Sequence, residues 1–585
     1  MATWWEQTNY TGTSSINKDA PRLLVVAFDF GTTYSGYAFS FRDDPLRIQS
    51  NQGWIAGSDQ LISLKTPTCV LLNQRQEFDS FGFEAENKFA DLAEDNKHHG
   101  WLLFRRFKMI LHNNENLSRS TTVEDINGKS MPALTVFTMA IRYLKDHFLE
   151  ALNKQKTGIE DKDIQYVITV PALWNDKAKQ FMREAAEKAG IAKTQLKLSF
   201  EPEAASIWCQ TISTDIKESL TRSGKQYMVI DLGGGTADIS VHEKQIDDTL
   251  KELHKASGGP WGGTIVDDNF IEWVTKIIGK STMQRFKDEQ MEDYFQLLRE
   301  FEIKKRNIKT DSTGNITFRL PASLKYLYRK DNRDTLKDRI VAMGLSDVVK
   351  YNGDKLRVDA SVIKQWFEPP IYNVIQHVQQ ILSKPNMQKV ETIILVGGFG
   401  ECKYAQDILK KAMHDRKIFI PEEPGLVVLK GAVRFGHFQE IVRSRIMTHT
   451  YGIGVVGEYD EQEYQNAGEV SFHRDRNFVD IVVFDIIIRA GDETSIGKVI
   501  TKGPYVPSAL HTTHFVIYTT ETFDPKFVTD QGCKQIGMLT VSHANGRCQD
   551  DNPLMASFIF GDTELYVKAV NIRTKEEFST YIDCL

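Results

Sequence analysis

Two widely separated stretches, each containing Asp, Gly and Thr, restrict the folds open to this chain more than any other feature. The first is DFGTT at residues 29–33, and the second is DLGGGTAD at residues 231–238. Each follows an apolar run typical of a buried strand, so each is expected to begin at a strand end. A single copy is equally consistent with an ordinary strand–turn–strand unit. Two copies in the same context indicate a repeated structural unit with a shared site.

The residue types in both stretches favour a phosphate-binding site. Glycine lets backbone N–H groups turn toward an anion and approach it closely. Threonine hydroxyls add hydrogen-bond donors, and an Asp carboxylate can hold Mg²⁺, commonly through water. We therefore predict that the two turns grip a triphosphate from both sides, with Asp29 and Asp231 holding the metal through water. The predicted nucleotide contacts in these stretches are Asp29, Gly31, Thr32, Thr33, Tyr34, Gly233, Gly234, Gly235 and Thr236.

The two stretches resemble the phosphate-1 and phosphate-2 motifs of the superfamily that contains actin, hexokinase and the 70-kDa heat shock proteins. The segment DFGTTYSG is similar to the start of a heat shock protein ATPase domain, and VIDLGGGTADISV is similar to its second phosphate loop. This resemblance implies an α/β fold with two actin-like lobes, each a mixed sheet flanked by helices. It also implies ATP or ADP with Mg²⁺ in the cleft between the lobes.

The resemblance assigns catalytic roles to several carboxylates. Glu201, which follows a predicted strand over residues 195–200, matches the glutamate that helps to organise the metal and the attacking water. Asp231 and Asp238 are the other acidic members of the predicted catalytic set. Because carboxylates that converge on one site repel each other, the cluster of Asp29, Glu201, Asp231 and Asp238 is expected to need a cation.

A catalytic lysine is expected in the basic and aromatic stretch at residues 100–109, because the family has one at about this distance from the first motif. Lys108 is the best match, and Arg105 and Arg106 are alternatives for the same role. Without the resemblance, such a stretch is more typical of the end of a surface helix. Glu203 has no family counterpart, and we interpret it as a carboxylate favoured by a helix dipole.

Further segments are predicted to close on the phosphates and to hold the adenosine. The glycine-rich segment 257–264 precedes a helix, and a helix N-terminus behind glycines is a natural anion site. It matches a family loop that contacts the phosphates, here through Gly262 and Gly263. The family's ribose and base contacts match Glu302, Lys305 and Arg306, which lie at helical spacing. A solvated charged helix face is the alternative for these three.

A third apolar strand, predicted over residues 392–396, leads into the family's adenosine motif at Gly397, Gly398 and Phe399. Three positions depart from the family pattern. Lys309, Phe399 and Glu401 replace a serine, a small polar residue and a base-stacking arginine. We therefore expect a remodelled base pocket with weaker selectivity for adenine.

The length of 585 residues exceeds what one core usually supports, so several domains are expected. We predict a mobile tail over 1–21 and a nucleotide-binding domain over 22–440. Its lobes cover about 22–205 and about 225–440. A β-rich domain over 441–585 is predicted to lack the acidic linker and helical lid of the generic chaperone. Motifs near the C-terminus, such as RSR at 443–445 and FVTD at 527–530, resemble the divergent heat shock 70 kDa protein 12 branch.

Composition narrows the function classes. The net charge of −6 gives no electrostatic footprint for nucleic acid, and no apolar run reaches the length of a membrane span. The six cysteines contain no CxxC pair and are interpreted as reduced thiols, which together with the lack of a signal peptide favours a cytoplasmic protein.

Three functions compete at this point. The first is an ATP-driven, chaperone-like switch in which nucleotide controls how the β domain holds a client or partner protein, with co-chaperones as further partners. The second is a nucleotide-binding scaffold that barely hydrolyses, and the third is a metabolite kinase of the same superfamily. The appended β domain favours the first two.

Overall fold

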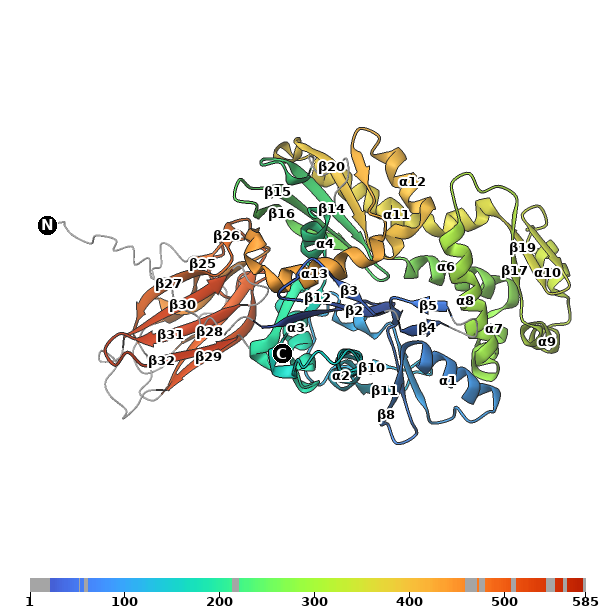
Figure 1. Ribbon diagram of the computed structural model, residues 1–585, viewed down its shortest axis with the longest axis horizontal. Helices are drawn as coiled ribbons and strands as arrows, with labels where there is room; N and C mark the ends of the chain where they lie inside the picture. The colour runs from blue at the N-terminus through green and yellow to red at the C-terminus, as the bar shows by residue number, and fades with distance from the viewer. Residues whose placement is uncertain are drawn as a thin grey trace.

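The computed structural model describes residues 22–51, 53–56, 61–212, 220–457, 471–472, 479–506, 512–542, 553–560, 565–581 and 585. The predicted tail at 1–21 lies outside the described residues, as do Cys548 and Cys584. The described chain forms two α/β lobes with a β domain beside them, drawn in red at one end of the molecule in Figure 1. The predicted α/β class, with two helix-flanked mixed sheets and a β-rich C-terminal region, is confirmed.

The sheet of lobe I is built on the first predicted hairpin. Strand β1 (Leu24–Phe30) is buried along its whole length and runs antiparallel to β2 (Tyr34–Phe41). On its other side β1 pairs in parallel with β12 (Ile164–Val170), which is followed by β13 (Leu196–Phe200). Helices α2 (Ala133–Lys154) and α3 (Asp176–Lys188) belong to the same hydrophobic core.

A smaller sheet in lobe I holds the basic aromatic stretch. Its order is β8 (Phe78–Phe81), β7 (Cys69–Leu72) and β9 (Leu102–Arg105), and helix α1 (Gly82–Glu94) packs against it. Strand β9 leads into a short 3₁₀ helix, η1 (Phe107–Leu111). The stretch at 100–109 is therefore a buried strand and turn, and the surface-helix alternative is wrong.

Lobe II repeats the arrangement around the second hairpin. Strand β14 (Gln226–Leu232) pairs antiparallel with β15 (Ala237–Lys244) and in parallel with β20 (Val390–Val396). The full order is β21 (Lys417–Phe419), β20, β14, β15, β16 (Leu250–Gly259), β22 (Val442–Ile446) and β26 (Glu493–Ser495). Helices α6 (Thr264–Ile278), α11 (Ala360–Leu382) and α12 (Lys403–Ala412) share the core of this lobe. The repeated hairpin with a parallel neighbour is the duplication that the sequence predicts.

An outer part of lobe II packs against the core of that lobe. It contains α7 (Lys280–Glu289), α8 (Met291–Asn307), α9 (Ala322–Asp331) and α10 (Leu336–Ala342). A three-stranded sheet of β17 (Asn315–Arg319), β19 (Lys355–Asp359) and β18 (Val349–Asn352) completes it. The two lobes meet through α4 (Glu201–Cys209) and α13 (Val427–His437), whose apolar residues form one core with both main sheets. Figure 1 shows α4 and α13 between the sheets.

The β domain consists of two antiparallel sheets with one core between them. One contains β24 (Ser471–Phe472), β25 (Val479–Ile488), β23 (Thr450–Gly457), β28 (Thr512–Thr520) and β29 (Lys534–Ser542), in that order. The other contains β27 (Lys498–Tyr505), β30 (Leu554–Phe560), β31 (Tyr566–Asn571) and β32 (Glu577–Tyr581). In the described part of the chain after residue 441 there is no α-helix. Strands β22 and β26 belong to neither sheet of the β domain, because they extend the sheet of lobe II.

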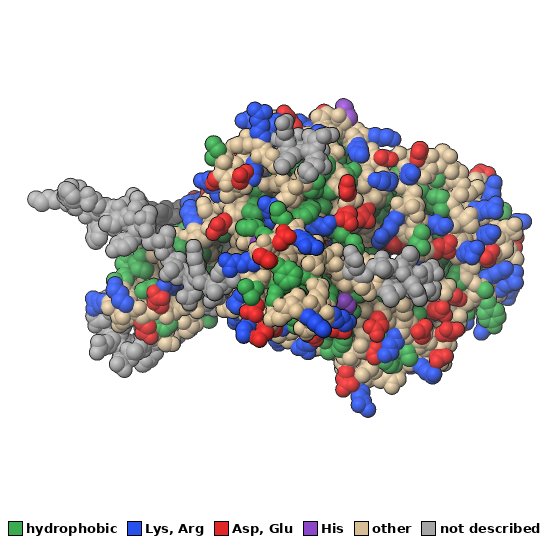
Figure 2. All heavy atoms as spheres, viewed as in Figure 1, with side chains coloured by type: hydrophobic (Ala, Val, Ile, Leu, Met, Phe, Trp, Pro, Cys, Tyr) green, Lys and Arg blue, Asp and Glu red, His purple; other side chains and the backbone are tan. Residues whose placement is uncertain are grey.

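The surface mixes both signs of charge. On the face in Figure 2, coloured Lys and Arg side chains alternate with Asp and Glu side chains, as the net charge of −6 suggests. No helix in the described ranges is both long and apolar enough to cross a lipid bilayer. The described cysteines, Cys69, Cys209, Cys402 and Cys533, are free thiols.

Candidate nucleotide-binding site

The two predicted phosphate turns face each other across the lobes. A side chain at Gly234 would place its Cβ 2.3 Å from the Thr33 hydroxyl oxygen, and one at Gly235 would lie 2.7 Å from the Thr32 hydroxyl oxygen. Only glycine permits this approach, because any larger residue would push the turns apart. The second turn is closed by the Gly233 N–H, which donates to the Thr236 carbonyl at 2.9 Å.

Four carboxylates converge beside these turns, as the sequence predicts. Asp29, Glu201, Asp231 and Asp238 are 7%, 9%, 6% and 1% exposed, and Asp231 and Asp238 are directly paired residues of the β14–β15 hairpin. They come from the ends of β1 and β14, the start of β15 and the first turn of α4. The strand ends therefore bring together residues that are far apart in the sequence.

The carboxylates raise one another's pKa. Burial, together with the charges of Asp238 and Asp29, raises the pKa of Glu201 to about 7 against the lowering effect of Lys108. Burial and then the charges of Glu201, Asp238 and Asp29 raise the pKa of Asp231 well above its usual value. The pKa of Asp238 is raised by burial as well.

Two ammonium groups partly offset this charge. Lys108 Nζ lies 2.9 Å from Glu201 Oε1, and Lys65 Nζ lies 2.5 Å from Asp29 Oδ2. When all four carboxylates are ionised, the two ammonium groups leave two negative charges buried together, a charge that a divalent cation would neutralise. No group of three or more His, Cys, Asp or Glu side chains in the described ranges could hold a metal ion. The surplus charge thus fits a Mg²⁺ ion that is held through water. The prediction that Asp29 and Asp231 hold this ion stays a prediction.

The alternatives to Lys108 have other partners. Arg105 pairs with Glu86 at 2.8 Å. Arg106 reaches across to lobe II, where it contacts Asp267 at 3.0 Å and Asp268 at 2.9 Å. Of the three cations, Lys108 is the one that the structure places against a predicted catalytic carboxylate.

The glycine-rich loop before α6 lies on the second phosphate turn. Gly263 N–H and Thr264 N–H donate to the carbonyls of Gly233 and Gly234 at 3.1 and 2.9 Å, and Gly262 N–H donates to Gly235 at 3.2 Å. The loop therefore supports the turn in this conformation. Contact of Gly262 and Gly263 with phosphate stays a prediction.

The predicted ribose and base contacts lie together on α8. Lys305 Nζ bridges Glu302 and Asp267 at 2.6 Å each, and Arg306 Nε donates to Glu302 at 2.8 Å. The Arg306 guanidinium lies 5.8 Å from the ring centre of Tyr34, so α8 of lobe II meets the first hairpin of lobe I. Lys305 is only 11% exposed, whereas Arg306 is 54% exposed, so the solvated-face alternative fails for Lys305 but not for the whole group.

The structure shows how the residues of the predicted adenosine motif are packed. Gly397 adopts φ +88°, and a Cβ there would lie 2.3 Å from a carboxylate oxygen of Asp231. Phe399 is 6% exposed and stacks on Phe367 with ring centres 6.4 Å apart, so one face of its ring belongs to the core of lobe II. Glu401 accepts a hydrogen bond from Gly425 N–H, and its charge acts on Arg306. Lys309 is exposed on the segment after α8, and Gly398 has open space beside it.

Two features of the site escaped the sequence interpretation. Lys65, which pairs with Asp29, stands in a mixed segment without a distinctive pattern. Glu203 is more than a helix-start carboxylate, because both of its oxygens accept hydrogen bonds from Arg445, at 2.6 and 2.7 Å. Their positions lie 242 residues apart in the chain, and no local pattern links them.

Comparisons with known proteins agree with this geometry. The family described as "Hsp70 protein" matches residues 102–333. The chain is 33% identical to human heat shock 70 kDa protein 12B, over 96% of this chain and 91% of that protein. It is 33% identical to human heat shock 70 kDa protein 12A, over 98% of this chain and 93% of that protein. A more distant relative is the chaperone protein DnaK of Mycoplasmopsis synoviae, 21% identical over 57% of this chain and 50% of that protein.

The near full-length similarity, the paired phosphate turns and the buried carboxylate cluster lead to one assignment. This chain belongs to the Hsp70 family, in the branch of heat shock 70 kDa proteins 12A and 12B.

Proposed function

We propose that this protein is a slow ATPase of the chaperone type, in which the nucleotide state controls how the C-terminal β domain binds a partner protein. Membership of the Hsp70 family supports nucleotide binding. Bound Mg²⁺-ATP supplies the γ-phosphate and neutralises the carboxylate cluster. Lys108, Glu201 and Asp238 are assigned to the catalytic set around the attacking water, and Asp29 and Asp231 to hold the hydrated metal. The cytoplasmic location expected from the sequence stays a prediction.

The observation that carries the proposal is the position of Glu203, one half-turn from Glu201 on α4. Glu201 faces Lys108 in the nucleotide site, whereas Glu203 is paired with Arg445 of β22. Both members of the second pair are buried, at 5% and 7% side-chain exposure. One rigid helical turn therefore touches the reacting centre with one carboxylate and the strand leading to the β domain with another.

Strand β22 is held by further carboxylates. Arg443 contacts Asp247 at 2.9 Å, Ser444 donates to Glu493 at 2.6 Å, and the Ile446 N–H donates to Glu252 at 2.8 Å. The generic chaperone has an acidic, leucine-rich linker, whereas this segment is basic and is held by acidic partners. Docking of this segment is thus expected to depend on charge more than on apolar burial.

The β domain also contacts lobe I directly. The Tyr451 hydroxyl lies 2.9 Å from a carboxylate oxygen of Asp176 on α3, and Lys534 pairs with Glu115 at 2.6 Å. A change in how the lobes close would move α3, α4 and β22 relative to the β domain. This supports coupling between the cleft and the partner-binding domain.

The test follows hydrogen exchange at β22 and single-turnover ATP hydrolysis in the same samples. Exchange at β22 is expected to differ between ATP and ADP in the native chain and to lose that difference in the double variant Glu203→Met/Arg445→Met. Both residues are replaced because removing only one would leave the other as an unpaired buried charge. Such a charge would destabilise the fold by about 3–5 kcal/mol. The control is Glu391→Gln, on β20 of the same sheet, where this carboxylate is 70% exposed and pairs with Lys225 away from β22. Exchange at β22 that is the same with ATP and ADP in the native chain would contradict the proposal, and nucleotide binding without hydrolysis would favour the scaffold alternative.

A further inference from the structure

A lysine that belongs to none of the predicted motifs lies in the carboxylate cluster. The Lys65 ammonium nitrogen is 2.5 Å from Asp29 Oδ2, and the two side chains are 20% and 10% exposed. The other oxygen of this carboxylate, Oδ1, accepts a hydrogen bond from the Thr169 hydroxyl at 3.1 Å. Both oxygens of a residue that is predicted to hold the metal therefore already have a donor from the protein.

Gly36 leaves room for the stem of this lysine. Strand β2 pairs with β1 so that Gly36 lies directly opposite Asp29. A Cβ at Gly36 would come within 2.9 Å of Lys65 Cγ and 3.0 Å of the Leu64 carbonyl oxygen. Because this position has no side chain, the lysine can pass over β2 and reach the carboxylate.

The segment that carries Lys65 is attached to the first phosphate turn. Strand β6 (Thr66–Pro67) pairs with the start of β2. The Thr68 N–H donates to the Thr33 carbonyl at 2.9 Å, and the Thr68 hydroxyl donates to the Gly31 carbonyl at 2.6 Å. The backbone of Lys65 is therefore fixed beside the turn, and only its side chain has to move for the ammonium group to leave the carboxylate.

The ammonium group also acts on the second residue that is predicted to hold the metal. Burial raises the pKa of Asp231, and the charge of Lys65 acts in the opposite direction. A divalent cation held by Asp29 and Asp231 would be repelled by an ammonium group bound to the same carboxylate. Lys65 and the metal ion thus require the same partner.

We propose that Lys65 is a positioning residue of the nucleotide site: its ammonium group competes with the divalent cation for Asp29 and thereby determines how strongly nucleotide binding depends on Mg²⁺. This role rests on the proposed nucleotide-binding function and adds to it a counter-ion that the chain itself supplies. With Lys65 in place, the cluster accepts phosphates with less need for metal. Without Lys65, the cluster carries one more unit of negative charge, which attracts a metal ion and repels nucleotide that has none.

The first test measures Mn²⁺ binding to the full-length protein without nucleotide. Mn²⁺ takes the same oxygen ligands as Mg²⁺ and is detected directly by electron paramagnetic resonance. Lys65→Met keeps the length of the side chain but removes its charge. This variant is expected to bind Mn²⁺ at least about tenfold tighter than the native chain, because one unit of opposing charge is gone.

Two further substitutions of the same residue separate charge from folding. Lys65→Gln, which keeps a polar group, should show the same gain in Mn²⁺ affinity, and Lys65→Arg should bind Mn²⁺ like the native chain. A damaged fold would weaken Mn²⁺ binding, so a gain would not arise from misfolding. Equal or weaker Mn²⁺ binding by both Lys65→Met and Lys65→Gln, compared with the native chain, would overturn the proposal.

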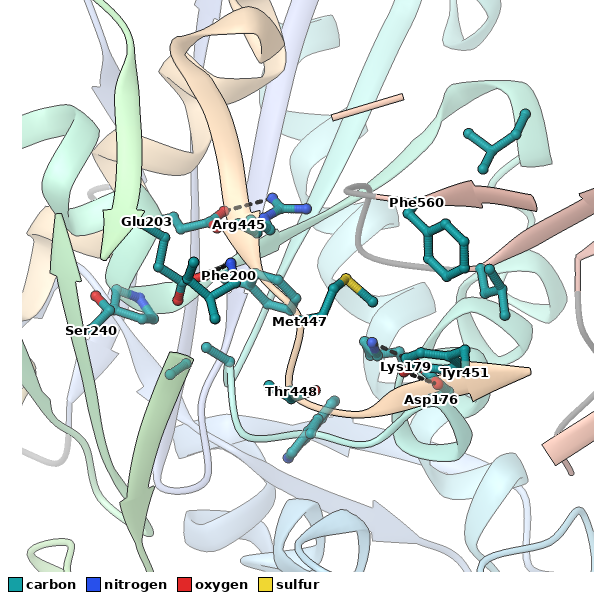
Figure 3. A pocket seen from close by; sticks show the side chains of 18 residues that line it. Asp176, Lys179, Phe200, Glu203, Ser240, Arg445, Met447, Thr448, Tyr451 and Phe560 are labelled. Carbon is teal, nitrogen blue, oxygen red and sulfur yellow. Dashed lines mark hydrogen bonds and ion pairs between the residues drawn. The ribbon is translucent and has the colours of Figure 1, made fainter. Parts of the chain in front are cut away.

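Two other proteins locate the effect. Adding Asp29→Asn to Lys65→Met should abolish the gain in Mn²⁺ affinity. The matched control is Lys179→Met. Lys179 pairs with Asp176 at 2.7 Å and is similarly enclosed, with 12% and 18% exposure, but this pair lies at the pocket beside the β domain (Figure 3). The control should bind Mn²⁺ like the native chain. A gain that persisted without Asp29, or appeared equally in Lys179→Met, would show that the proposal is wrong.

The second test compares ATP binding with Mg²⁺ and with a chelator by calorimetry. Removal of Mg²⁺ should weaken ATP binding by a factor that is at least about tenfold larger in Lys65→Met than in the native chain, because nucleotide without metal meets one more negative charge there. An equal factor in both proteins would overturn the proposal. If ATP bound neither protein while Lys65→Met still gained Mn²⁺ affinity, competition for Asp29 would be supported and the nucleotide-binding function would be wrong.

Discussion

The Lys108 ammonium nitrogen lies 2.9 Å from a Glu201 carboxylate oxygen, and only 4% of the lysine side chain is exposed. The Trp174 ring lies on another side of this nitrogen, with its centre 5.1 Å away. Lys108 is thus held in place by contacts within the protein. A fixed cation next to a carboxylate suits charge stabilisation during phosphoryl transfer better than a mobile one would.

The first prediction concerns hydrolysis. Glu201→Gln keeps the volume of the side chain but removes its charge, so single-turnover ATP hydrolysis should fall by about 100-fold. Binding of ATP should persist, because the glycine turns and Asp231 are unchanged. The measurements are single-turnover kinetics and calorimetric titration on the same preparation. Unchanged turnover in this variant would remove Glu201 from the catalytic set.

The second prediction is stabilisation by nucleotide. At a concentration near 100 times its dissociation constant, Mg²⁺-ATP should raise the free energy of unfolding by about 3 kcal/mol. The charge surplus of the carboxylate cluster means that ATP without Mg²⁺ should stabilise less. Thermal unfolding with ATP, with and without Mg²⁺, checks both statements, and an unchanged melting temperature at millimolar Mg²⁺-ATP would refute nucleotide binding.

The third prediction concerns pH. The folded-state pKa of Glu201 is raised from 4.5 to about 7, so the folded protein binds this proton more tightly than the unfolded chain. Stability without nucleotide should therefore fall as pH rises from about 4.5 to about 7. The difference in unfolding free energy between the native chain and Glu201→Gln isolates this effect. That difference should shift in favour of the variant with rising pH, and a constant difference would contradict the raised pKa.

The fourth prediction concerns the base. Loss of the family's stacking arginine removes about 1–2 kcal/mol of cation–π attraction, and Glu401 places a negative charge near Arg306. ATP should therefore bind only modestly better than GTP. Calorimetry with both nucleotides measures the ratio, and Glu401→Gln should raise affinity for both. A strong preference for ATP would show that other residues select adenine.

The fifth prediction concerns nucleotide release. Arg106 of lobe I contacts Asp267 and Asp268 of lobe II, so these pairs must separate when the lobes open. Arg106→Ala should speed release of a fluorescent ADP analogue by several-fold, since partly exposed ion pairs contribute up to about 1 kcal/mol each. Release from the native chain should also become faster with salt. The control is Arg75→Ala on an exposed turn, and equal release rates for all three proteins would exclude a role for Arg106 in opening.

Local patterns in the sequence predicted the elements of the site but not its long-range partners. The turns at 31–33 and 233–236, the acidic cluster and the helix carrying Glu302 follow from motifs that extend over a few residues. The role of Lys65 could not be predicted, because only the packing of the lobe I sheet brings it next to its partner Asp29. Glu203 lies in the first turn of α4, as predicted, but its partner could not be assigned, since Arg445 approaches it only after β22 joins the sheet of lobe II.

The shared sheet of lobe II has a consequence for synthesis of the protein. Strand β26 comes from residues 493–495, inside the β domain, yet it pairs with β22 at the edge of that sheet. Translation of the first 440 residues therefore leaves β16 with an open edge, a feature that invites pairing with other chains. Strand β22, at Val442–Ile446, covers that edge, but the outer edge of β22 then stays open until β26, at Glu493–Ser495, has left the ribosome and folded back. During synthesis the sheet of lobe II thus ends in an unpaired strand until part of the β domain has been made.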